Sequence, residues 1–115
     1  MANTFKVVTK AGVISADVIY TAGSGVTAIV LGLILGNTTT SQITSTVTLT
    51  SDTSSRAGAN NEDNQAVELI TNAPIPAGSS LELLSGNKVV LETTDTISVT
   101  GSGATDVALS IMEIT

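Results

Sequence analysis

The carboxylates are the side chains of this sequence best able to do chemistry, because the residues that usually accompany them in active sites are missing. The 115 residues include no His, no Cys and no Trp, and four Lys and Arg stand against ten Asp and Glu. Histidine and cysteine supply most general acid–base catalysis near neutral pH, many activated nucleophiles and many transition-metal ligands. The sequence therefore predicts a protein that is not an enzyme and that needs no cofactor.

The densest group of polar side chains lies between residues 52 and 65, in the run DTSSRAGANNEDNQ. Its oxygens are of the kind that Ca²⁺ takes, about six to eight at a time, but the alternating Asp spacing of calcium loops is missing. We therefore predict a long exposed loop without a metal, which is either simply solvated or a contact site. The candidate contact residues are Asp52, Arg56, Asn60, Asn61, Glu62 and Asp63.

The other acidic residues are spread along the chain. A glycosidase would need two carboxylates that face one cleft, one of them with a raised pKa. Four of these residues fall instead at the ends of strand-like runs or in turns, where a charge commonly prevents edge-to-edge aggregation. These are Glu82, Glu92, Asp95 and Asp106.

Three further motifs have structural explanations. Phe5 and Tyr20 stand in apolar runs, so we expect both rings to fill the core and not to stack on a sugar. The glycines of AGSG at 22–25 are followed by no helix and no Lys-Ser/Thr pair, which predicts a turn and not a phosphate loop. The run NTT at 37–39 matches the N-glycosylation pattern, which we interpret as a coincidence because MANTFKVVTK at the start has no apolar signal segment.

Apolar and polar residues alternate with a period of two, which is typical of a strand with one buried face. Ile43, Ser45, Val47 and Leu49 alternate with threonines. Further along, Ile97 and Val99 alternate with Thr96, Ser98 and Thr100. The runs 26–35 and 105–114 are apolar on both faces. No window has the periodicity of a helix.

Turn signals rich in Gly, Asn, Pro and Ser cut the chain at short intervals. We therefore expect one domain over residues 1–115: an all-β, jelly-roll-like sandwich of eight or nine short antiparallel strands. NAPIPAG at 72–78 predicts a crossover between sheets, and LSGNK at 84–88 predicts a tight hairpin. The expected strands are 3–9, 13–21, 26–35, 41–51, 65–72, 79–84, 88–93, 95–100 and 105–114.

Charge and hydropathy restrict the partners. A hydrophobic content of 42% with a positive mean hydropathy of +0.41 indicates a folded chain despite a net charge of −6. That acidity disfavours nucleic acid and anionic membranes as partners. The longest apolar run, 26–35, is half of the roughly 20 residues that a membrane-spanning helix needs.

Several stretches together resemble the small virion structural proteins of tailed bacteriophages, notably those of marine bacteria and cyanobacteria. The strongest is NAPIPAGSSL at 72–81. The motifs are turns and strands, so they point to no active site and carry over no functional residue. The other stretches are MANTFK at the start, YTAGSG at 20–25 leading into LGL at 31–33, GNTT at 36–39, GNK at 86–88 and ALSIMEI at 108–114.

The resemblance implies a non-enzymatic virion protein, assembled in the cytoplasm of the bacterial host. The first expectation is a head decoration or cement protein that stabilises the capsid, working as a homo-oligomer, and as a trimer by analogy with decoration proteins on local three-fold axes. Its partners would be copies of itself and the major capsid protein. The alternatives are a neck, tail or fibre-associated component, or a module that binds a host surface or carbohydrate through the 52–65 loop.

One physical argument agrees with self-association. The run 26–35 has no polar face beyond Thr27. Excess apolar surface on a protein in water is commonly covered by a partner, and a closed symmetric assembly satisfies identical patches without open-ended growth. The sequence therefore predicts that a neighbouring subunit covers this strand.

Overall fold

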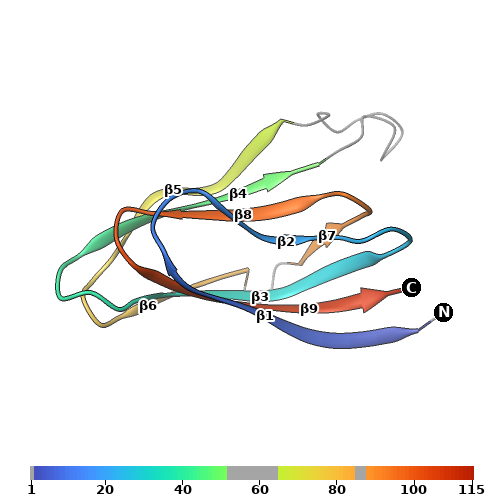
Figure 1. The fold of residues 1–115 in the computed structure, drawn as a ribbon, viewed down its shortest axis with the longest axis horizontal. Coiled ribbons are helices and arrows are strands. Elements are labelled where there is room, and N and C mark those ends of the chain that lie inside the picture. The colour runs from blue at the N-terminus through green and yellow to red at the C-terminus, as the bar shows by residue number, and fades with distance from the viewer. Residues whose placement is uncertain (1, 52–64, 85–87) are drawn as a thin grey trace.

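A computed structural model describes residues 2–51, 65–84 and 88–115 of the chain. These residues form nine strands and no helix, arranged as two antiparallel sheets that pack face to face (Figure 1). The predicted all-β sandwich is confirmed. The strands are β1 (Asn3–Val13), β2 (Asp17–Thr21), β3 (Thr27–Asn37), β4 (Ile43–Thr50), β5 (Ala66–Ile75), β6 (Ser80–Leu83), β7 (Val89–Leu91), β8 (Thr96–Gly101) and β9 (Thr105–Ile114).

The pairing of the strands is that of a long hairpin rolled up once. β4 pairs with β5, β3 with β6 and β7, β2 with β8, and β1 with β9, so that the pairs are nested around the β4–β5 connection. Rolling places them in a five-stranded sheet, β1-β9-β3-β6 with β7 also on β3, and a four-stranded sheet, β2-β8-β4-β5. This nested arrangement is the jelly-roll topology, in agreement with the prediction.

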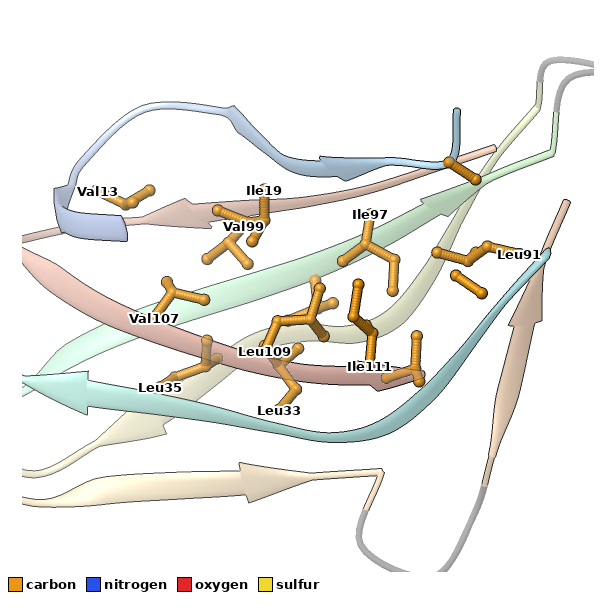
Figure 2. Packing of buried hydrophobic residues seen from close by; sticks show 14 of the residues in the cluster. Val13, Ile19, Leu33, Leu35, Leu91, Ile97, Val99, Val107, Leu109 and Ile111 are labelled. Carbon is orange, nitrogen blue, oxygen red and sulfur yellow. The ribbon is translucent and has the colours of Figure 1, made fainter. Parts of the chain in front are cut away.

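The core lies between the two sheets and follows the period of two. In β9, Val107, Leu109 and Ile111 are buried and alternate with outward-facing residues, and Ile97 and Val99 of β8 meet them from the opposite sheet (Figure 2). Ile43 and Val47 of β4 are also buried. β-Branched and aliphatic side chains suit such pleated surfaces, because they pack against their cross-strand neighbours.

Two boundaries between predicted strands are placed differently by the structure, and the first is the turn expected between the strands 3–9 and 13–21. Gly12 does not end the first strand: β1 continues to Val13 through a register shift between Lys10 and Val13, and Gly12 takes a φ of +67° there. A glycine with positive φ is typical of a bulge that lets a strand bend without ending. The bend allows β1 of one sheet to lead into β2 of the other.

The hairpin predicted at 84–88 is wrong, because the strands on either side of it, β6 and β7, pair with β3 and not with each other. Residues 85–87 themselves lie outside the described part of the chain. Leu83 pairs with Leu33, and Val89 pairs with Val30, so β6 and β7 follow one another along the same edge of β3. Lys88 lies between them in sequence and is exposed. By contrast, the Pro-rich segment after Asn72 does connect the two sheets, as predicted, because β5 and β6 belong to different sheets.

Candidate interaction surface

Metal-ligating side chains do not gather at one place among the described residues. Among them there is no group of three or more His, Cys, Asp or Glu side chains arranged to hold a metal ion. The described residues also contain no helix that is long and apolar enough to cross a membrane.

Asp95, which is predicted at a turn, is buried. Its carboxylate accepts a 3.0 Å hydrogen bond from the Glu92 N–H, and this bond stabilises the turn before β8.

The six candidate contact residues of the polar loop lie outside the described residues. The strands on either side of it are described, and Thr50 of β4 pairs directly with Ala66 of β5. The segment therefore joins two neighbouring strand ends at the tip of the innermost hairpin. Its candidate residues are Asp52, Arg56, Asn60, Asn61, Glu62 and Asp63.

Asn37, the acceptor of the glycosylation pattern, is a structural residue. Its side chain is 4% exposed. Its amide Nδ2 donates to the carbonyls of Ile75 at 2.9 Å and Ser41 at 2.8 Å, and its Oδ1 accepts from the N–H and the hydroxyl of Thr39. A buried amide with four hydrogen bonds fastens the β3–β4 connection to the end of β5, and its nitrogen is not accessible in the folded protein.

Lys6, Tyr20 and Glu113 form a polar cluster at the side of the sandwich. The Lys6 Nζ lies 2.8 Å from Oε1 of Glu113, and the Tyr20 hydroxyl donates to Oε2 at 2.6 Å. The hydrogen bonds from Lys6 and Tyr20 lower the pKa of Glu113, while burial and the bond to Glu113 raise the pKa of Tyr20. The cluster holds β1, β2 and β9 together, and its satisfied hydrogen bonds favour a structural role.

The most unusual surface is the outer face of the five-stranded sheet. Phe5, Met112, Ile29 and Val90 are paired in register across β1, β9, β3 and β7, which makes one continuous apolar row. Because their strand neighbours such as Ile111 point into the core, these four side chains point outward. Phe5 is 72% and Val90 57% exposed. No described strand of the other sheet covers this face (Figure 1).

The apolar character continues beyond the apolar row. Val7 is 63% exposed, and Ile34 is 46% exposed beside Ala108, its register partner. Two shallow depressions, of about 360 Å³ and about 170 Å³, adjoin Ile34. The larger is lined by Thr9, Lys10, Ala11, Ile34, Gly36, Asp106, Val107 and Ala108, and the smaller by Leu31, Gly32, Leu33, Ile34, Glu82 and Leu83.

Sequence reasoning found one part of this surface and missed the rest. Ile34 of the run 26–35 is 46% exposed on the outer side of β3, in keeping with the absence of a polar face there, while the covering of this strand by a neighbouring subunit stays a prediction. The prediction that Phe5 fills the core is wrong, because the register of β1 on β9 turns Phe5 to the same face as Met112. Tyr20 does pack against the core. Period alone could not assign Phe5 to a face, since Phe5 and Val7 alternate with Lys6 and Val8, and Val8 is the one packed inward.

Comparisons with known proteins relate this chain to a fold and to no family. No family model matches the sequence, and no curated protein does. A solved structure from Bacillus endospore appendages, which form a novel family of disulfide-linked pili, is similar over 97% of this chain and 84% of its own, with a TM-score of 0.50 and 15% identity. At that identity the likeness extends to the fold alone. The present sequence has no cysteine.

Proposed function

We propose that the protein is a non-enzymatic structural subunit of a phage virion, first of all a head decoration protein that stabilises the capsid as a homo-oligomer. The observation that carries the proposal is the uncovered apolar outer face of the five-stranded sheet. A chain with a net charge of −6 that keeps Phe5 and Val7 more than 60% exposed on one face is built to bury that face against protein.

The fold supports a structural role without requiring it. Jelly rolls form viral capsid domains, but they also serve lectins and cupins, so the topology must be considered together with the surface. The similar solved structure comes from disulfide-linked pili, which are also structural assemblies. The resemblance of the turn motifs to tailed-phage virion proteins favours the virion as the assembly.

A carbohydrate-binding module agrees less well with the surface. Phe5 is exposed, so it could stack on a sugar ring. Its register neighbours are Met112 and, beyond it, Ile29. Sugar recognition needs convergent hydrogen-bonding groups beside the ring, and this apolar row offers none from its side chains. The face is therefore better matched to a protein than to a glycan.

Copy number in purified virions tests the proposal. Quantitative mass spectrometry of particles from the phage that encodes the chain should find it in hundreds of copies per particle. A handful to a few dozen copies would replace head decoration by a neck, tail or fibre position. Absence from washed, intact particles would contradict a virion role altogether.

A further inference from the structure

We infer that the outer face of the five-stranded sheet is a self-contact, on which two copies of the chain pack back to back about a two-fold axis parallel to the strands. The inference deepens the proposed structural role and rests on it. It commits the apolar row to one occupant, a second copy, and gives the arrangement of the pair. In a two-fold contact each patch meets its own counterpart, so the face must match itself.

The apolar row matches itself about this axis. An axis running between β9 and β3 exchanges β1 with β7 and β9 with β3. Phe5 of one copy then lies over Val90 of the other, and Met112 lies over Ile29. The rotation does not shift residues along the strands, so residues of one register row meet residues of the same row in the second copy. Sheets packed face to face with nearly aligned strands interdigitate in this way, at an angle of about 30°. All four positions of the row therefore meet apolar partners.

The remainder of the face is also compatible with this axis. Ile34 and Ala108 share another register row, and the axis places Ile34 of each copy over Ala108 of the other. The larger depression, which both residues line, lies at this position. The exposed Glu82, register partner of Ile34 on β6, meets the threonine of β1 (Thr9) in this arrangement. No two acidic groups are brought together, and Asp106 faces Gly36.

The alternative axis, perpendicular to the strands, fits poorly. To keep the whole face in contact, this axis must cross the register row of Ser110, and it then sets Val90 over the carboxylate of Glu82. Burying a carboxylate against an aliphatic side chain without a hydrogen-bond partner is strongly unfavourable. Glu82 therefore favours the axis parallel to the strands, in which it meets the hydroxyl of Thr9.

The size of the face is sufficient for a stable pair. Three strands of 10 or 11 residues (β1, β3 and β9) and the shorter β6 and β7, which together have 7, give a flat footprint of about 600 Å² at about 4.8 Å per strand and 3.4 Å per residue. The accessible area of a corrugated surface exceeds its footprint, and a stable interface of standard size buries about 800 Å² on each partner. The contact closes at two copies, so a dimer takes the place of the trimer that the resemblance implies.

Cysteine cross-linking tests the arrangement. The chain has no native cysteine, so every cross-link must come from the introduced residues. The double variant Phe5→Cys/Val90→Cys of the purified protein should form a covalent dimer with a short bismaleimide reagent, whose spacer bridges the roughly 10 Å between two facing sheets. Within one molecule the two positions are three strand spacings, or about 14 Å, apart, which lies beyond the reach of that spacer. Phe5→Cys alone should give little dimer, because the two-fold axis keeps the two copies of that position equally far apart.

The outcomes separate this inference from the proposed function. A ladder of higher oligomers, efficient dimerisation of Phe5→Cys alone, or no cross-link from a double variant that melts like the wild type would each overturn the two-fold contact. Should the double variant fail to fold, Phe5→Asp replaces it: it should turn the dimer into a monomer, whereas the matched change Val18→Asp on β2, at 49% exposure, should not. Copy number in virions tests the proposed function independently of all these results.

Discussion

The Tyr20 hydroxyl donates a 2.6 Å hydrogen bond to the carboxylate of Glu113, 93 residues away along the chain. Tyr20 lies on β2 of the four-stranded sheet and Glu113 on β9 of the five-stranded sheet. The bond therefore joins the two layers of the sandwich directly. Lys6 completes the cluster from β1, with its Nζ 2.8 Å from the same carboxylate.

Removing the hydroxyl should weaken the fold. We expect Tyr20→Phe to lower the free energy of unfolding at pH 7 by about 1–2 kcal/mol, since a partly buried hydrogen bond to a charged group is lost. Urea denaturation measures this. Lys6→Met is the comparison variant, because it removes the more exposed ion pair and leaves the Tyr20 bond in place, and its loss should be smaller. Equal stability of Tyr20→Phe and the wild type would contradict the assigned role of the bond.

Stability should be nearly constant between about pH 6 and 8, where no side chain of this composition has its ordinary pKa. The stability of the fold should change with pH only below and above that range. The pKa of Glu113 is lowered from 4.5, so its stabilisation is complete above pH 4.5 and is lost as the pH falls through the folded-state pKa. The pKa of Tyr20 is raised from 10.0, so its contribution is complete below pH 10 and is lost as the pH rises further.

Thermal melts from acid to alkaline pH test this profile. The melting temperature of Tyr20→Phe should fall less steeply above pH 10 than that of the wild type, because the titrating phenol is gone. A shift of many degrees between pH 6 and 8 in the wild type would refute the profile, since it would require another group with a strongly displaced pKa.

Shortening the polar loop should leave the fold intact. Thr50 and Ala66 pair directly, so a turn of a few residues can connect β4 to β5. We expect a chain in which a short Asn-Gly turn replaces residues 52–64 to unfold cooperatively with stability close to that of the wild type, because closure entropy depends weakly on loop length. Circular dichroism and urea denaturation check this. Failure to fold would make the segment part of the folding unit, whereas folding with lost particle binding would make it a docking element.

Ser45 offers a stabilising substitution. Its hydroxyl is buried in β4 and makes no hydrogen bond with any described part of the chain. We expect Ser45→Ala to raise the free energy of unfolding by up to about 1 kcal/mol, since an unpaired buried hydroxyl is costly. Thr105→Val is the contrasting control: Thr105 is also buried, but its Oγ1 donates to the Gly103 carbonyl at 3.0 Å, so that substitution should destabilise. Destabilisation by Ser45→Ala would show that its hydroxyl is satisfied.

The sequence allowed most of the fold to be predicted, because the two strongest local signals agree. Alternation in 43–50 and 96–100 identifies both the strands and their buried faces, and Gly- or Pro-containing turns separate the strands. The errors fall where pairing is non-local. Gly12 resembles a turn locally, but β9 continues to pair beside it and makes it a bulge. LSGNK resembles a hairpin, but β3 is long enough to hold β6 and β7 in succession.

The candidate surface could be predicted only in part for the same reason. The excess of apolar residues in β3 is a property of one segment and is visible in the sequence. The apolar row depends on registers that join residues 5, 112, 29 and 90, and no local pattern fixes those registers. Phe5 shows the difference most clearly: its surroundings in sequence are apolar, yet its side chain is 72% exposed.

The central claim, that the outer face of the five-stranded sheet binds a second copy, is tested most directly by the mass of the purified protein. Sedimentation equilibrium at tens of micromolar should give twice the 11.5 kDa of one chain. Phe5→Asp should restore the mass of a single chain, while Val18→Asp should leave the dimer unchanged. A wild-type protein that sediments as a monomer, or a dimer that survives Phe5→Asp, would contradict the claim.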